Sequence, residues 1–148
     1  MARHVVELKP RWADMDAYGH VNNVTWLEYL QEARIDLFFV HAPSRGTDRL
    51  AEGVVVARAE IDYRRPLVFR PDPVRIEMWV SRVGAAAFDV EYEVLDVEDD
   101  GTRIVYARAA TVLVPVTLGD GRPRRLTAEE RSVLIALADD PAPARPGC

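Results

Sequence analysis

The stretch Asn-Val-Thr-Trp-Leu-Glu-Tyr-Leu-Gln-Glu-Ala-Arg-Ile-Asp-Leu-Phe-Phe-Val, residues 23–40, decides the fold. Apolar residues recur in it at the spacings of one helical face: Trp26, Leu30, Ala33, Leu37 and Val40. Four more apolar residues widen this face: Leu27, Ile35, Phe38 and Phe39. A helix that is apolar over most of its circumference is expected to be largely enclosed by other elements.

The segments on either side of this helix have the alternation of strands. One short strand is expected before it, at residues 4–9, and a polar loop after it, at residues 41–53. Four longer strand-like segments follow: residues 54–68, 74–83, 87–97 and 102–116. A short C-terminal helix should then start at Thr127, because Thr127 and Glu130 have capping-box spacing.

This order of elements predicts an α+β fold, in which an antiparallel sheet of about five strands wraps around one long central helix. A chain of 148 residues fits a single domain, and we assign residues 1–138 to it. Residues 139–148 contain three prolines and no periodicity, and we expect a disordered tail there. Long strands leave an edge that needs covering, so we expect a homodimer or homotetramer.

Composition limits the function. The net charge of −5 argues against a nucleic-acid partner, because such domains are usually basic. No apolar run is long enough for a membrane span, and the N-terminus lacks the apolar core of a signal peptide. The only cysteine is Cys148, which suits a reducing compartment. We therefore expect a cytoplasmic protein without a membrane partner.

The chemistry is expected in the turn that leads into the helix. Asp14 and Asp16 lie two residues apart and are followed by Gly19 and by Asn23 at the helix start. The first N–H groups of a helix have no intrahelical partner and attract negative charge. A carboxylate beside such groups suits hydrolysis of an activated acyl group, with the amides stabilising the oxyanion. Spacing alone favours a turn or capping role for Asp16 over a catalytic one.

The run Arg-Trp-x-Asp-x-Asp-x-x-Gly-His-Val-Asn-Asn-x-x-Trp-Leu-Glu-Tyr-Leu-x-Glu-Ala-Arg, residues 11–34, resembles the opening motif of 4-hydroxybenzoyl-CoA thioesterase-like proteins. The stretch Ile-Asp-Tyr-Arg-Arg-Pro-Leu, residues 61–67, is similar to the second strand of that family. The resemblance implies the hotdog fold and an acyl-CoA thioesterase acting on a fatty or aromatic acyl group, with sites at subunit interfaces. It also implies a catalytic carboxylate at Asp16, an oxyanion site at backbone N–H groups near Asn23, and close approach of substrate at Gly19.

Further residues have a functional and a structural interpretation. His20 is either a proton shuttle or, as we favour, a residue that fixes the turn through a ring hydrogen bond. Tyr18 and Trp26 either line the acyl pocket or belong to the core. Arg64 and Arg65, together with Arg70, either bind CoA phosphates or form a solvated surface.

Three carboxylates are alternatives or companions to Asp16. Asp14 either shares the site or, as we favour, has a structural role in the turn. Glu28 and Glu32 lie on the helix, from which some hotdog thioesterases take their carboxylate, and either could replace Asp16 as the principal catalyst. Glu28, Glu32 and Asp36 also form an acidic line that needs compensation by solvent or by other segments.

Two other functions stay open. A non-catalytic acyl-CoA sensor would not need an intact Asp16, and a hotdog dehydratase or hydratase would use a histidine with a carboxylate elsewhere in the chain. The sequence has no Gly-x-Ser-x-Gly motif and no Cys-His pair, which argues against serine and cysteine hydrolases. No set of residues has metal-ligand spacing, so we expect no metal and no cofactor apart from the CoA of the substrate.

Overall fold

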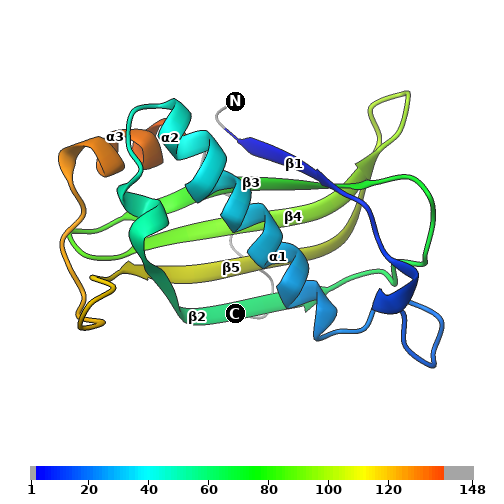
Figure 1. Ribbon diagram of the computed structural model, residues 1–148. Helices are drawn as coiled ribbons and strands as arrows, with labels where there is room; N and C mark the ends of the chain where they lie inside the picture. Colours follow the sequence, from blue (N-terminus) through cyan, green and yellow to red (C-terminus); the bar gives the residue numbers. More distant parts are fainter. Residues whose placement is uncertain (1–2, 139–148) are drawn as a thin grey trace.

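A computed structural model describes residues 3–138 as one five-stranded antiparallel sheet crossed on one face by a helix (Figure 1). The strands, in the spatial order β1-β3-β4-β5-β2, are β1 (His4–Leu8), β3 (Val74–Val83), β4 (Phe88–Val97), β5 (Arg103–Pro115) and β2 (Val54–Tyr63). The crossing helix is α1 (Thr25–Asp36). The predicted α+β fold is confirmed, whereas the expected tail at residues 139–148 lies outside the described residues.

The core lies between α1 and the inner face of the sheet. Trp26, Tyr29, Leu30 and Ala33 are buried along one side of α1. On β4 and β5, the side chains that face α1 alternate along the sequence and are buried beneath the helix: Phe88, Val90, Tyr92, Val94, Ala107, Ala109 and Leu113. Burial of such apolar surface is the dominant favourable term in folding, so this alternation fixes which face of the sheet receives the helix.

The outer face of the sheet is charged instead of apolar. Glu77 and Glu93 are almost fully buried there, and Arg3 and Arg103 contact both carboxylates. Burial alone would raise the pKa of Glu77, but hydrogen bonds from Arg103 and Arg3 outweigh it and lower that pKa. The two buried carboxylates on this face are therefore paired with arginines.

The helical region is longer and less enclosed than expected. After α1 the chain continues through a π-helical turn, η2 (Leu37–His41), most of which lies in the predicted helix. A short helix, α2 (Ala42–Ser44), follows where a loop was predicted. Pro43 lies at the start of α2, directly after the π-helical turn, in which the N–H of Ala42 donates to the carbonyl of Leu37. The prediction of an enclosed helix is wrong for this chain alone, since Leu27, Ile35 and Phe39 are 44%, 42% and 56% exposed.

Strand β2 ends at Tyr63, five residues before its predicted end. The N–H groups of Arg64 and Arg65 both donate to the carbonyl of Tyr106, at 2.9 and 3.1 Å, which ends the regular pairing with β5. Pro66, which follows, has no N–H to continue a ladder. The chain therefore leaves the sheet next to the turn that precedes α1, where Val21 donates its N–H to the carbonyl of Leu67 at 2.8 Å.

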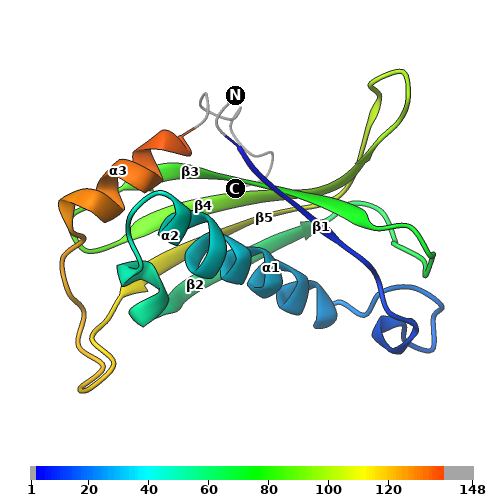
Figure 2. The same ribbon diagram turned by 45° about the horizontal axis from the view of Figure 1, so that its top comes forward.

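The C-terminal helix α3 (Ala128–Ala136) has the predicted capping box, with Thr127 and Glu130 exchanging side-chain and backbone hydrogen bonds. It packs at the end of the sheet far from the turn that precedes α1 (Figure 2). Short 3-10 turns, η1 (Trp12–Asp14) and η3 (Arg49–Glu52), complete the elements. Within residues 3–138, no helix has both the length and the apolar character needed to cross a bilayer.

Candidate active site

The turn before α1 is closed by its own backbone. Asp16 donates its N–H to the carbonyl of His20 at 3.1 Å, and Gly19 donates its N–H to the carbonyl of Asp16 at 3.0 Å. Gly19 has a φ of +84°, a conformation that residues with a Cβ rarely adopt. Glycine at this position lets the chain reverse direction between Asp16 and the start of α1.

The carboxylate of Asp16 is held at both of its oxygens. Oδ1 accepts the backbone N–H of Tyr18 at 2.9 Å, and Oδ2 accepts the side-chain amide of Asn22 at 3.1 Å. The side chain is only partly exposed. Asp16 therefore points a fixed carboxylate from the turn toward the first residues of the helix.

The turn just before α1 contains a backbone amide, that of Asn23, with no acceptor among the described residues. The carbonyl of Asn23 accepts the hydroxyl of Tyr63 at 2.8 Å, which ties the helix start to the end of β2. The N–H of Val24 is taken by Oδ1 of Asn22 at 2.9 Å. Among the described residues, no hydrogen-bond acceptor engages the N–H of Asn23. That group is available to a substrate carbonyl oxygen.

A cavity of about 410 Å³ joins these groups. Ten residues from the turn, from α1 and from the end of β2 line it: Asp16, Tyr18, His20, Val21, Asn23, Trp26, Tyr63, Arg64, Arg65 and Pro66. It therefore brings together every predicted site residue except Gly19, which lies in the same turn outside the lining. Trp26 belongs to the hydrophobic core and also lines the cavity. It packs edge-on against Tyr63, with the ring centroids 6.3 Å apart.

His20 does not make the ring hydrogen bond that we expected. Its carbonyl, and not its ring, closes the turn through the N–H of Asp16. The ring of His20 lies against that of the exposed Tyr18 in a stacked arrangement, with the ring centroids 6.4 Å apart. Both rings line the cavity beside Asp16.

The three candidate phosphate-binding arginines separate into two groups. Arg64 and Arg65 line the cavity and are exposed, and neither guanidinium forms an ion pair with any residue in 3–138. Arg70 instead forms a two-pronged ion pair with Asp96 and bonds to the carbonyls of Asp72 and Pro73. The suggestion that Arg70 binds phosphate is therefore wrong, because its donors are already used to shape the turn before β3.

Asp14 has the structural role that we favoured. It is buried, and its carboxylate accepts the Tyr29 hydroxyl at 2.6 Å and three N–H groups of Arg11 at 2.9 to 3.1 Å. Burial opposes ionisation, but the hydrogen bonds from Tyr29 and Arg11 outweigh it and hold the pKa of Asp14 below its usual value. Burial and the neighbouring Asp14 raise the pKa of Tyr29.

The alternative carboxylates lie apart from Asp16. Glu28 and Glu32 line a second cavity, of about 270 Å³, together with Asp14, Tyr29 and Lys9. Arg11 approaches Glu28 at 3.8 Å and His4 contacts Asp36 at 2.7 Å, so other segments compensate part of the acidic line on α1. The cavity that contains the free amide of Asn23 includes neither Glu28 nor Glu32.

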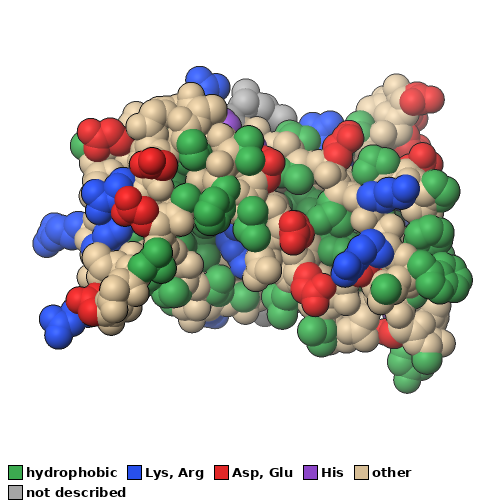
Figure 3. All heavy atoms as spheres, viewed as in Figure 1, with side chains coloured by type: hydrophobic (Ala, Val, Ile, Leu, Met, Phe, Trp, Pro, Cys, Tyr) green, Lys and Arg blue, Asp and Glu red, His purple; other side chains and the backbone are tan. Residues whose placement is uncertain are grey.

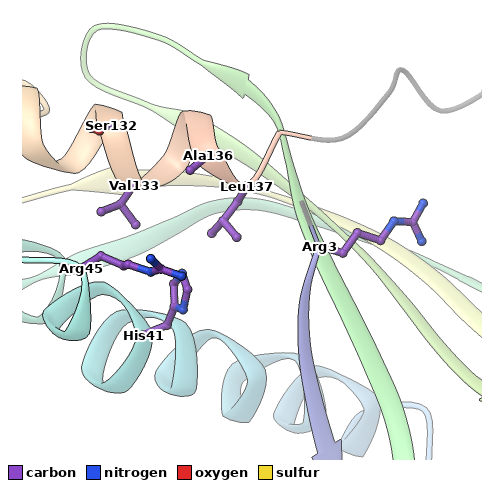
Figure 4. A pocket seen from close by; sticks show the side chains of 7 residues that line it. All are labelled: Arg3, His41, Arg45, Ser132, Val133, Ala136 and Leu137. Carbon is purple, nitrogen blue, oxygen red and sulfur yellow. The ribbon is translucent and has the colours of Figure 1, made fainter. Parts of the chain in front are cut away.

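A larger cavity, of about 470 Å³, lies elsewhere, between α3 and the end of the helical region (Figure 4). Val133 and Leu137 point toward His41 and Arg45 across it, whereas Arg3 points away and pairs with Glu77 and Glu93. The described residues that line this cavity include no carboxylate, so it lacks the group that thioester hydrolysis needs here.

Two residues at the site had no assigned function in the sequence: Asn22 and Tyr63. Asn22 was visible only as one of several turn formers, although its place just before a helix is typical of a capping residue. Tyr63 was part of a strand pattern, and its bond to a carbonyl forty residues earlier depends on how β2 meets the turn.

Comparison with known proteins identifies the family of the chain. The family model described as "Thioesterase-like superfamily" matches residues 10–143. The long-chain acyl-CoA thioesterase FadM of Escherichia coli is 29% identical over 128 residues, which are 86% of this chain and 94% of that protein. A thioesterase from Thermus thermophilus, solved with coenzyme A and Zn, is 35% identical with a TM-score of 0.71 over 93% of this chain and 95% of the other.

A 4-hydroxybenzoyl-CoA thioesterase mutant, solved with 4-hydroxybenzoyl-CoA, has a TM-score of 0.76 at 15% identity over 90% of this chain and 99% of the other. At that identity the likeness shows the fold alone, and it is the hotdog fold that the opening motif implied. The resemblance found in residues 11–34 is thus confirmed by a family match over most of the chain. The chain belongs to the thioesterase-like superfamily and is a thioester hydrolase.

Proposed function

We propose that the protein hydrolyses a fatty or aromatic acyl-CoA to the free acid and CoA at the cavity of Asp16. One observation carries the proposal: a carboxylate fixed at both oxygens lies in the same cavity as the unengaged N–H of Asn23. A preorganised amide donor that meets the developing oxyanion is usually a large term in acyl-transfer catalysis. A thioester also has a good leaving group, so no strong general acid is required.

Asp16 has two routes to the same products. As general base, it takes a proton from water while the water oxygen bonds to the thioester carbon; the C–S bond then breaks and the thiolate of CoA takes up a proton. As nucleophile, a carboxylate oxygen bonds to that carbon and displaces CoA, and water hydrolyses the mixed anhydride. In both routes the N–H of Asn23 binds the oxyanion.

The remaining walls of the cavity suit the two ends of such a substrate. Arg64 and Arg65 supply uncompensated positive charge for the phosphates of CoA. Val21, Trp26 and Tyr63 supply apolar and aromatic surface for the acyl group. The similarity to FadM and to the CoA-bound enzyme of Thermus thermophilus supports an acyl-CoA as substrate.

We further propose that the active enzyme is a homodimer or homotetramer. Strand β2 is an edge of the sheet, and Val55 and Val56 on it are about half exposed. Leu27, Ile35 and Phe39 expose apolar surface on the neighbouring helical region, and hydrophobic side chains gather on this face (Figure 3). Pairing of two β2 edges would cover both the strand and this surface.

Such pairing would also complete the site. In an antiparallel pair around a two-fold axis, the Val54 end of one β2 lies beside the Tyr63 end of the other. The cavity at Tyr63 would then be walled by the second copy, which agrees with the expectation of sites at subunit interfaces. We keep the cytoplasm as the proposed location, because the chain has a single cysteine, Cys148.

Release of free thiol with Ellman's reagent tests the proposed activity. Acyl-CoAs of increasing chain length and benzoyl-CoA are supplied to the purified protein, and saturable thiol release is expected for at least one class. Saturable binding of acyl-CoA without thiol release would instead support the sensor. Loss or gain of the enoyl chromophore without thiol release would support a dehydratase or hydratase.

The two chemical routes are separated by a single turnover in water labelled with oxygen-18. When Asp16 is the nucleophile and water attacks the aspartyl carbonyl of the mixed anhydride, the label enters the carboxylate of Asp16. A general base does not acquire the label, all of which appears in the released acid.

A further inference from the structure

Asn22 links the turn to the start of the helix through both its side-chain amide and its backbone groups. Its side-chain N–H group donates to Oδ2 of Asp16 at 3.1 Å, and its Oδ1 accepts the N–H of Val24 at 2.9 Å. Its backbone N–H donates to the carbonyl of Asp14 at 3.0 Å, and its carbonyl accepts the N–H of Trp26 at 3.4 Å. The backbone is thus anchored on both sides, which fixes the point from which the side chain reaches Asp16.

Asparagine is suited to this position by its chemistry as well as by its length. The bridge needs an acceptor for Val24 at one end and a donor for Asp16 at the other, and a primary amide provides both. Aspartate would keep the acceptor but present a negative oxygen to the Asp16 carboxylate. Serine would keep an acceptor for the nearby N–H of Val24 but is too short to bridge to Asp16.

We infer that Asn22 is a positioning residue that holds the Asp16 carboxylate in its reactive orientation beside the start of α1. This inference rests on the proposed function of Asp16. With Asn22, both oxygens of Asp16 are held, one by Tyr18 and one by the amide. Without it, one bond remains and the carboxylate rotates away from the reacting carbon. Because loss of this bond changes the orientation of the Asp16 carboxylate more than it changes substrate binding, kcat falls while KM stays close to its original value.

The neutrality of the Asn22 side chain matters for a separate reason. An aspartate at position 22 puts a second negative charge beside Asp16 and favours the protonated form of the catalytic carboxylate. The acid limb of kcat/KM then moves to higher pH, by on the order of one pH unit for two unit charges about 4 Å apart in water. The other charged or titratable groups at the cavity are Tyr18 and His20 from the turn and Tyr63, Arg64 and Arg65 from the end of β2. All five are unchanged in the variants.

The test compares three variants with the wild-type enzyme on the best acyl-CoA found. Asn22→Ser is expected to lower kcat about 10- to 100-fold with KM within about threefold, as for a misaligned catalytic group. Asn22→Asp is expected to move the acid limb upward. Ser132→Asp adds the same negative charge at an exposed position of α3, at the far end of the sheet, and is expected to leave both the limb and kcat unchanged. Thermal unfolding of each variant verifies that it is folded.

A direct titration covers variants that are too slow for kinetics. The carboxyl carbon resonance of Asp16, assigned by its loss in Asp16→Asn, is followed against pH in the wild-type protein and in Asn22→Asp. A midpoint that moves upward supports the inference. An unmoved midpoint, an acid limb that coincides with wild type, or an Asn22→Ser enzyme with unchanged kcat each overturns it. Failure of the wild-type enzyme to release thiol, or full activity of Asp16→Asn, overturns the proposed function instead.

Discussion

Replacing Tyr29 by Phe removes one oxygen from the structure beneath the active-site turn. That hydroxyl is buried and donates to Asp14 at 2.6 Å. A hydrogen bond to a charged group contributes about 1.5–3 kcal/mol to stability. Three N–H groups of Arg11 remain on Asp14, so the carboxylate is not left unpaired. We therefore expect a loss of about 2 kcal/mol in the free energy of unfolding, and a fall of about 6 °C in Tm for a chain of this size.

The loss should depend on pH in a defined direction. The pKa of Asp14 in the folded protein lies below its ordinary value of 3.8, so its ionised form stabilises the fold above that value. This contribution disappears as the pH falls through the lowered pKa, because Asp14 is then protonated in both states. At pH 7 the full effect of Tyr29→Phe is expected, and in strong acid only the weaker bond between neutral groups, about 1 kcal/mol, remains.

Tyr92→Phe is the matched control. The Tyr92 hydroxyl is also buried, but it pairs with the neutral hydroxyl of Thr111 at 2.7 Å and with Arg34, which stays charged, at 3.3 Å. Its loss should cost about the same at neutral and acid pH. Urea or thermal unfolding at fixed protein concentration measures both variants at several pH values. The reasoning is refuted if Tyr29→Phe shows no more pH dependence than Tyr92→Phe.

Three further predictions concern the substrate, the metal and the assembly. Arg64→Ala and Arg65→Ala should each raise KM for acyl-CoA about fivefold, but they should leave KM unchanged for an acyl-pantetheine, which lacks the nucleotide phosphates. Replacement of the exposed Arg125 by alanine is the control. Equal effects on KM for both substrates would contradict phosphate binding. Dialysis against EDTA should not change kcat, because the proposed steps need only Asp16 and the amide of Asn23; a loss that Zn²⁺ restores would contradict this. Phe39→Asp should lower the mass measured by light scattering toward that of the 16.7 kDa chain and should reduce kcat. An unchanged mass would exclude the exposed apolar surface around Phe39 as the subunit interface.

Local periodicity was enough to predict most of the fold. The third strand was predicted at residues 74–83 and is observed as Val74–Val83, because its alternation and the prolines before it are both local signals. The capping box of α3 was equally visible in four consecutive residues. The end of the helical region was missed, because Pro43 and Ser44 indicate a loop locally, whereas burial of Ala42 carries the helix further.

The candidate site was most readily predicted where its residues are neighbours in the sequence. Asp16, His20 and Asn23 lie in one turn, so a single motif was sufficient to find them. The ion pair of Arg70 could not be predicted, because its partner, Asp96, is 26 residues away and is reached only through the pairing of the strands. The exposure of Leu27, Ile35 and Phe39 could not be predicted either, since a sequence reveals how apolar a helix is but not which surface covers it.

The kcat of Asp16→Asn tests the central claim most directly. The amide keeps the size of the side chain and can still accept the N–H of Tyr18, so the turn and the binding of acyl-CoA should be retained. Removing a carboxylate that acts as general base or nucleophile should lower kcat by several orders of magnitude, with an unchanged Tm to within a few degrees. A folded Asp16→Asn enzyme that keeps most of its thiol-releasing activity would contradict the account.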